Sequence, residues 1–307
     1  MKKYIFALFF LLLEAQGSMG CDICGCGVGS YYIGILPDFN KRIIGLRYRY
    51  NQMSSHLGVN GSTSYLTSSE QYQTVELWGA WNLGPKFRIM ANIPQNFNKR
   101  TNQAGVNKKA GLGDISFNGF YQLLNKRTVV KSRKLLVQSL WVGAGLKLPT
   151  GEYNPADKQN TTSASNLFQL GTASFDYSFN LMYDIRYDDA GLNLNSSYKF
   201  NSQNKYEYSY GNKFNLSVQA YYKWRMVKHL SVSPNAGILI ETSKNDIDQR
   251  IQVYASGGQI VMATLGAETI HKSIAFGFGF QTPVSQQLAN GMVSSGSRFF
   301  GHVSYLF

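Results

Sequence analysis

Residues 213–226 read KFNLSVQAYYKWRM, and apolar or aromatic residues occupy every second position from Phe214 to Trp224. Mostly polar residues, from Asn215 to Arg225, occupy the positions between them. Successive side chains of a β-strand point to opposite faces, so this stretch predicts a strand with one apolar and one polar face.

The same alternation recurs in residues 175–186 and 192–201. A soluble sandwich would bury such an apolar face, whereas a transmembrane barrel would turn it toward lipid and keep the polar face inside. Many of these segments run to about ten residues or more, which suits a bilayer-spanning strand better than the shorter strands of soluble proteins. Strand length therefore favours the barrel.

The connections between the predicted strands alternate between long and short. We expect strands near 41–51, 70–83, 86–95, 112–124, 134–148, 173–186, 190–201, 213–226, 229–242, 258–270, 272–282 and 297–307. The long connections are then 52–69, 96–111, 149–172, 202–212, 243–257 and 283–296. Long outer loops and short periplasmic turns are typical of bacterial outer-membrane barrels. The sequence thus predicts an all-β, antiparallel, up-and-down transmembrane β-barrel of about twelve strands, with both termini in the periplasm.

The last predicted strand ends in Phe307, and Tyr305, Val303 and Phe299 share its face. A terminal strand with this pattern is similar to the signal that the outer-membrane assembly machinery reads, and we expect that machinery to be a partner. The alternative is an ordinary edge strand. Its unpaired backbone N–H and C=O groups would find no hydrogen-bond partners in lipid, so closure of the barrel is favoured.

The composition excludes a bundle of membrane helices. Mean hydropathy is −0.22, and no run of 18 apolar residues, which a spanning helix would need, follows residue 20.

The formal net charge is +13. In a cytoplasmic protein this charge would suggest nucleic acid, but in an exported chain it favours acidic lipid head groups or anionic solutes, and we expect no nucleic-acid partner.

The first twenty residues predict export. Lys2 and Lys3 precede an apolar stretch from Tyr4 to Leu13, and small residues follow, as in a secretory signal peptide. The expected organisation is a signal peptide at 1–20, a Cys/Gly-rich periplasmic or plug segment at 21–38, and the barrel at 39–307. The expected location is the outer membrane of a Gram-negative bacterium.

Three short motifs, at 111–115 (GLGDI), 145–151 (GLKLPTG) and 170–176 (LGTASFD), stand in an order that resembles the outer-membrane family named after the MetA pathway of phenol degradation. The resemblance covers roughly residues 39 to 307. It implies a barrel of the same general plan as long-chain fatty-acid channels, and the passage of small, often apolar molecules.

The polar faces of the predicted strands would line the barrel interior or its mouths. They carry these charged residues: Arg47, Arg49, Glu76, Arg88, Lys147, Asp176, Asp184, Lys199, Lys223, Arg225, Glu241, Glu268 and Arg298. Basic residues outnumber acidic ones, so an aqueous pore would prefer anions. The alternative is that these charges pair across the interior and fill it.

The three cysteines, Cys21, Cys24 and Cys26, form one C-x-x-C-x-C motif after the signal peptide. Close thiolates suit Cu(I) or Zn, but three ligands are fewer than a structural zinc site needs. The alternatives are a disulfide with a spare thiol, natural in an oxidising envelope, or a lipidated Cys21.

One residue pair bears on whether the protein is an enzyme. His302 and Ser304 have the His-x-Ser spacing of an outer-membrane phospholipase, but Tyr305 and Leu306 stand where that family has Asn-Gly. We therefore expect no enzyme. The leading hypothesis is a passive outer-membrane channel or transporter, porin-like, for small hydrophobic or anionic solutes. The alternative is a metal-binding or redox-linked envelope protein that acts through the cysteines, with the barrel as its anchor.

Overall fold

A computed structural model describes residues 41–307 apart from 59–60, 131–133, 158–165 and 228–229. The predicted signal peptide, the Cys/Gly-rich segment and its three cysteines lie outside the described residues. No helix among the described residues has the length and apolar character needed to cross a bilayer.

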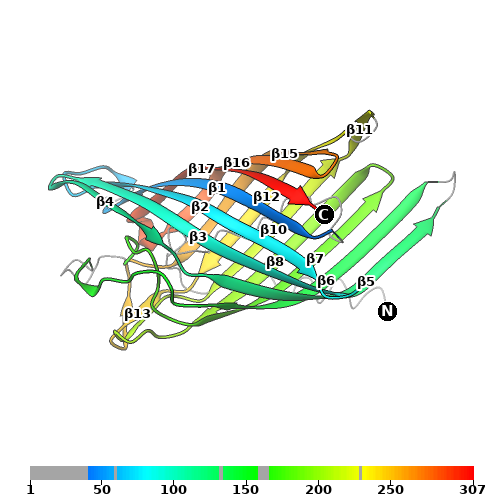
Figure 1. Cartoon of the computed structure of the whole chain (residues 1–307). Coiled ribbons are helices and arrows are strands. Elements are labelled where there is room, and N and C mark those ends of the chain that lie inside the picture. Colours follow the sequence, from blue (N-terminus) through cyan, green and yellow to red (C-terminus); the bar gives the residue numbers. More distant parts are fainter. Residues whose placement is uncertain (1–40, 59–60, 131–133, 158–165, 228–229) are drawn as a thin grey trace, which may run out of the picture.

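The described chain forms one closed antiparallel β-barrel with twelve strand positions (Figure 1), which confirms the predicted fold class. The barrel strands are β1 (Ile43–Ser55), β2 (Ser68–Asn82), β3 (Phe87–Asn102), β4 (Gly105–Leu112), β5 (Ser116–Val129), β6 (Leu135–Lys147), β7 (Asp176–Tyr187), β8 (Ala190–Asn201), β10 (Lys213–Tyr222), β11 (Trp224–Val227), β12 (Leu230–Ser243), β15 (Gly258–His271), β16 (Ile274–Leu288) and β17 (Val293–Leu306).

Two strand positions are each shared by two strands. β4 and β5 both pair with β3, and residues 113–115 interrupt them. β10 and β11 both pair with β12, on either side of Lys223. The pairing of β1 with β17 joins the first and last strands, so the described sheet closes on itself.

We name the two ends of the barrel by their connections. The loop end is where β1 ends and β2 begins, and the turn end is where β2 ends and β3 begins. At the turn end, β5 and β6 pair as far as Val129 with Leu135, whereas the pairing of β5 with β3 stops at Tyr121 with Phe87. This hairpin therefore extends beyond β3, whereas β7 pairs with β6 as far as Leu136 (Figure 1).

Several segments predicted as long loops are strands instead. β3 and β4 occupy most of 96–111, and β16 and β17 occupy most of 283–296. Residues 202–212 and 243–257 contain β9 (Tyr208–Ser209), β13 (Asp246–Asp248) and β14 (Ile251–Val253), which form a separate three-stranded sheet. Polar side chains suggested loops there, but backbone pairing satisfies these strands whatever side chains they carry.

The wall places apolar side chains outside and most charged ones inside. Leu265 on β15 is 62% exposed, whereas Glu76 on β2 is 4% exposed. A soluble protein has the reverse arrangement, because exposing large apolar side chains to water is unfavourable. The exposed face thus fits a lipid environment.

Two groups of inward side chains are apolar. The loop-end apolar cluster consists of Met53, Tyr72, Leu167, Phe168, Leu239, Ile260, Met262, Leu288, Ala289 and Val293. The turn-end apolar cluster consists of Ile43, Trp78, Ala80, Met90, Phe120, Trp141, Ala275 and Leu306. Charged and amide side chains line much of the wall between them.

Candidate functional site

The interruption between β4 and β5 turns the carboxylate of Asp114 into the protein, where it is 7% exposed. Asp114 Oδ1 accepts a hydrogen bond from the backbone N–H of Gly151 at 2.9 Å. Asp114 Oδ2 accepts bonds from the backbone N–H and the hydroxyl of Thr172, each at 2.9 Å. One side chain in the wall therefore holds both arms of the connection between β6 and β7.

Glycine is required where these two arms meet. A Cβ atom on Gly171 would lie 2.5 Å from the carbonyl oxygen of Gly151 and 2.6 Å from Asp114 Oδ1. A Cβ atom on Gly151 would lie 2.7 Å from Gly171 Cα. Such contacts are shorter than packed atoms allow, so larger residues would push the arms apart. The three motifs quoted from the sequence, at 111–115, 145–151 and 170–176, thus converge here.

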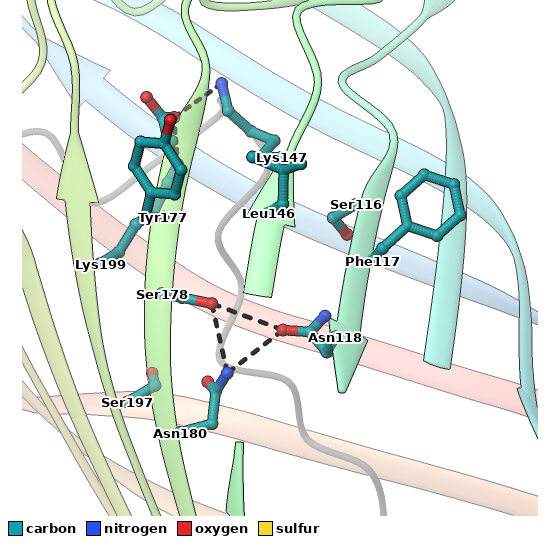
Figure 2. Close-up of a pocket in the computed structure, with 11 residues that line it drawn as sticks. Ser116, Phe117, Asn118, Leu146, Lys147, Tyr177, Ser178, Asn180, Ser197 and Lys199 are labelled. Carbon is teal, nitrogen blue, oxygen red and sulfur yellow. Dashed lines mark hydrogen bonds and ion pairs between the residues drawn. The ribbon is translucent and has the colours of Figure 1, made fainter. Parts of the chain in front are cut away.

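Lys147, at the end of β6, connects Asp114 with the next charged residue. Its Nζ lies 2.6 Å from Asp114 Oδ2 and 2.7 Å from Asp176 Oδ2. Lys199 of β8 lies 3.0 Å from the same oxygen of Asp176. Figure 2 shows the Lys147 side of this arrangement. We call Asp114, Lys147, Thr172, Asp176 and Lys199 the junction site.

Every charged side chain of the junction site is buried. The side chains of Lys147 and Lys199 are 7% and 8% exposed, and that of Asp176 is 0% exposed. Ser174 Oγ and the backbone N–H of Ser202 donate to Asp176 Oδ1 at 2.9 and 3.1 Å. Burial of a charge is costly unless it is paired and hydrogen-bonded, and here both conditions are met.

A small cavity of about 20 Å³ adjoins the junction site (Figure 2). Asn180 Nδ2 donates to Asn118 Oδ1 and to Ser178 Oγ, each at 3.2 Å. Such a volume holds about one water molecule. A Cβ atom on Gly145 would lie 2.2 Å from Asn118 Oδ1, so this glycine leaves room for the amide. The cavity can therefore hold a small polar group.

Residues 166–170, which we call the crossing segment, lie inside the barrel although they belong to a loop. Leu167 and Phe168 are 1% and 4% exposed and pack in the loop-end apolar cluster. The other members of that cluster come from β1, β2, β12, β15, β16, β17 and the residue next to β16. Because the segment connects β6 to β7, it reaches across the interior to strands on other sides of the wall.

Polar side chains of β3 and β4 tether the crossing segment. Asn96 and Asn98 donate side-chain hydrogen bonds to the carbonyl oxygens of Leu170 and Gln169, at 3.1 and 3.2 Å. Lys109 Nζ donates to the carbonyl oxygen of Phe168 at 3.0 Å and also pairs with Asp157. These bonds satisfy backbone groups that would otherwise be buried without partners.

Arg100 adds a contact of a different kind. Its guanidinium carbon lies 4.5 Å from the centroid of the Phe168 ring, and its Nε lies 2.8 Å from Glu70 Oε1. Glu70 in turn accepts a hydrogen bond from Ser55 at 3.1 Å and one from Tyr72. Arg100 therefore couples the crossing segment to the inner faces of β1 and β2.

Further ion pairs line the interior between the two apolar clusters. Arg47 lies 3.0 Å from Glu76, and Arg49 lies 3.7 Å from the other oxygen of the same carboxylate. Arg298 Nη1 lies 2.8 Å from Glu241 Oε2. In these ion pairs and in the junction site, charged residues that the sequence predicts to line the interior pair with one another. This is the alternative to an open, anion-selective pore that the sequence left open.

The remaining residues of that expected set lie nearer the turn end. Asp184 accepts hydrogen bonds from Tyr221 at 3.1 Å and from Asn193 at 3.3 Å. Arg88 is buried and donates to the carbonyl oxygen of Lys41 at 2.8 Å and to Asn82. Lys223 is half-buried between β10 and β11. The side chain of Arg225 is 61% exposed and pairs with Asp189, so it lies at the rim and not in the interior.

His302 lies between Glu268 and Ser304. Its Nε2 is 3.0 Å from Glu268 Oε2, and its Nδ1 is 3.1 Å from Ser304 Oγ. All three residues are buried. The His-x-Ser pair noted in the sequence therefore joins a carboxylate that sequence spacing did not reveal.

The structure adds Asp114, Glu70, Arg100 and Lys109 to the residues expected from the sequence. Asp114 stands inside the GLGDI motif, a signal that could have identified it. Arg100 and Lys109 lie in 96–111, which was predicted as a loop, and Glu70 is the first residue of the strand predicted at 70–83. Within the described residues, no three His, Cys, Asp or Glu side chains come together in a way that could hold a metal ion.

The expected assembly signal lies on the outer face, where its residues Phe299, Val303, Tyr305 and Phe307 are exposed.

Comparison with protein families gave a match to the family described as the MetA-pathway of phenol degradation, over residues 47–295. A search of curated proteins gave no match.

Solved structures gave matches to bacterial barrels. An outer membrane channel from Pseudomonas putida F1 has a TM-score of 0.61 and 11% identity, covering 87% of this chain and 96% of that chain. The β domain of the Bordetella autotransporter Brka has a TM-score of 0.44 and 10% identity, covering 86% and 99%. A Pseudomonas aeruginosa FadL homologue has a TM-score of 0.39 and 12% identity, covering 87% and 90%. At such identities the first of these shows the barrel fold alone.

Proposed function

The chain belongs to the family of the MetA-pathway of phenol degradation, and from this membership we propose that it is a passive outer-membrane channel for small, largely apolar molecules that carry an anionic or polar group. The exposed apolar face of the closed barrel supports the membrane location. On this proposal the loop end faces the outside of the cell and the turn end faces the periplasm.

The observation that carries the proposal is the loop-end apolar cluster. The strands turn Leu239, Ile260 and Met262 into the barrel interior, where these side chains are 0% exposed. The interior of a water-filled porin is polar, so a continuous apolar surface inside the barrel favours a solute that is itself apolar. Such a molecule would be stabilised there by about 25 cal/mol per Å² of apolar surface removed from water.

The junction site supplies the second part of the proposal. Lys147 and Lys199 share Asp176, and the adjoining cavity is lined by Asn118, Asn180 and other polar groups. A carboxylate or phenolate on the solute would meet ammonium and amide donors there, and charge-assisted hydrogen bonds are stronger than neutral ones. Because the two lysines are paired with Asp114 and Asp176, this arrangement would favour a hydrogen-bonding end on the solute, such as a hydroxyl group.

The crossing segment would act as the constriction of the channel. It packs Leu167 and Phe168 into the apolar cluster and is tethered by side-chain hydrogen bonds to β3 and β4. A solute that replaces Phe168 against Leu239 or Met262 would keep these apolar surfaces covered. Passage would then require a local movement of five residues, without a change in the barrel wall.

The test is solute flux through the purified full chain in lipid vesicles. We expect benzoate to enter much faster than in protein-free vesicles, and glucose to enter slowly. Replacement of Leu239→Ser should reduce benzoate flux roughly tenfold at most, because about 1.5 kcal/mol of apolar contact is lost. The volume-conserving Leu239→Met is the matched control and should retain the flux. Equal entry of glucose and benzoate would contradict the proposal.

The outer-membrane location and the assembly partner can be tested separately. The outward face of β17 ends in Val303 and Tyr305, and the exposed Phe307 follows the strand. If this face is read during assembly, Phe307→Ala should lower the amount of folded barrel in outer-membrane fractions, while Val284→Ala, also exposed on the outer surface, should not. Unchanged insertion of Phe307→Ala would remove this residue from the signal.

A further inference from the structure

Exposed basic side chains gather at the turn end of the barrel. Lys41 and Arg42 precede β1, Lys86 lies in the turn between β2 and β3, and Lys272 lies in the turn between β15 and β16. The β5–β6 hairpin adds Lys126 and Lys134. We call these six residues the basic collar, because they come from connections spaced around the barrel.

Few acidic groups oppose the basic collar. In the part of the chain that the structure describes, the acidic residues in the turn-end connections are Asp188 and Asp189, and Asp189 pairs with Arg225. Exposed residues at the loop end carry both signs, among them Glu152, Glu207, Lys205 and Lys244. The loop end also exposes Lys108 and Arg250, so both ends carry more exposed basic than acidic residues, and the excess is larger at the turn end.

Exposed aromatic residues lie next to the basic collar on the outer face. Trp81 is 40% exposed and Phe87 is 39% exposed on either side of the turn that holds Lys86. Lys134 Nζ lies 5.3 Å from the centroid of the Tyr187 ring. Tyr222 and Trp224 lie at the same end of β10 and β11. Aromatic side chains prefer the level of the lipid head groups, so the basic side chains lie where phosphates would be.

We propose that the basic collar binds the head groups of anionic phospholipids in the leaflet at the turn end. A ring of cations in contact with apolar and aromatic side chains matches a molecule that offers a phosphate and an acyl chain together. Lys and Arg side chains can bury their methylene stems against the apolar surface while their charged ends reach the phosphates. Each cation close to an anionic surface adds attraction, which falls off within a Debye length.

The proposal needs only that the barrel spans a bilayer, so its test is independent of solute flux. Two of the four tryptophans of the chain, Trp81 and Trp224, are exposed on the outer face, whereas Trp78 and Trp141 are buried inside. Phospholipids with brominated acyl chains quench tryptophan on contact. The readout is quenching in vesicles that contain brominated phosphatidylglycerol, compared with brominated phosphatidylcholine.

We expect phosphatidylglycerol to be enriched several-fold at the protein surface and to lose this advantage in high salt. The variant K86Q/K126Q/K134Q/K272Q should bring the ratio of the two lipids close to one. The matched control K108Q/K205Q/K244Q/R250Q removes the same charge at the loop end and should leave the enrichment unchanged. Gel mobility before and after heating shows whether each variant is folded.

Three results of the quenching experiment would overturn the proposal. They are equal quenching by both lipids in the unmodified protein, full enrichment in the collar variant, and equal loss in the loop-end variant. Inorganic phosphate added at constant ionic strength distinguishes a site for free phosphate from one for lipid. Competition by phosphate would overturn the lipid assignment, and absence of competition would support it. Failure of benzoate flux with intact lipid enrichment would reject the proposed channel and leave the collar in place.

Discussion

The two ends of the barrel interior are filled in different ways. At the loop end, a piece of loop enters the interior. Side chains of β3 and β4, and Asp114 between β4 and β5, hold it through its backbone. At the turn end, the apolar cluster consists of side chains of the wall itself, such as Ile43, Trp78 and Met90. The loop end can therefore open when one segment moves, whereas the turn end can open only through changes of side-chain rotamers.

The difference also concerns charge. The charged side chains of the junction site are buried, while those of the ion pair between Arg225 and Asp189 at the turn end are 61% and 27% exposed. Buried pairs are worth little relative to apolar replacements, but removal of one partner leaves an uncompensated charge. Exposed pairs contribute little in either direction. The same substitution should therefore lower the free energy of unfolding more at the junction site than in the exposed ion pair at the turn end.

The largest effect is expected from Asp176→Asn at the junction site. It leaves Lys147 and Lys199 without their shared carboxylate, and the free energy of unfolding should fall by about 3–5 kcal/mol. The measurement is urea unfolding of the folded barrel in lipid. Asp189→Asn at the turn end is the matched control and should cost less than about 1 kcal/mol. Equal losses at both ends would contradict the comparison.

A smaller loss is expected from Gly171→Ala, where the new Cβ atom would lie against the Gly151 carbonyl oxygen and Asp114. Overpacking of this kind costs about 1–3 kcal/mol. The displaced arm should also loosen the crossing segment and raise ion conductance in a planar bilayer. Gly301→Ala, where the nearest atom would be 3.6 Å from the new Cβ, should change neither quantity.

Arg100→Leu tests the tether of the crossing segment directly. It removes the contact with the Phe168 ring and the ion pair with Glu70, together worth roughly 1–3 kcal/mol. We expect higher and noisier conductance, because the segment leaves the interior more often. The double variant E70Q/R100L shows whether the unpaired Glu70 is responsible. If both variants conduct like the unmodified protein, Arg100 does not hold the segment.

The smallest effect is expected from Met90→Leu in the turn-end apolar cluster. This volume-conserving change should cost less than about 1.5 kcal/mol. Conductance should stay as it is, because no loop enters this cluster among the described residues. A large rise in conductance after so mild a change would mean that the turn end holds the constriction, and the comparison between the two ends would be reversed.

The sequence predicts the wall better than it predicts the interior. Alternation such as that of Phe214 to Trp224 reports which face each side chain takes, and this follows from local geometry alone. It could not show that Asn96 and Asn98 lie in a strand, because polar composition is shared by loops and by the parts of strands beyond the membrane. The pairing partner decides, and it lies elsewhere in the chain.

For the same reason, the sequence predicts only part of the junction site. Lys147, Asp176 and Lys199 could be predicted to face inward from their strand positions. The role of Asp114 depends on the interruption between β4 and β5, and the burial of Phe168 depends on a loop that turns inward; neither has a periodic signal. The short motifs did mark these places, since glycines at 151 and 171 are needed where two backbones touch.

The closure of the barrel by β1 and β17 bears on how the protein reaches its native state. The pairing runs from Ile43 with Leu306 to Ser55 with Val293, with one register shift between Asn51 and Met53. Every other neighbouring pair in the wall is joined by a hairpin or one connecting loop, so this seam has by far the largest separation along the chain. Contacts of high sequence separation form late, because the entropy of closing the intervening chain is lost before they stabilise the structure. Seam formation is therefore expected to be the slow, committing step of folding, preceded by an open sheet with two unpaired edges.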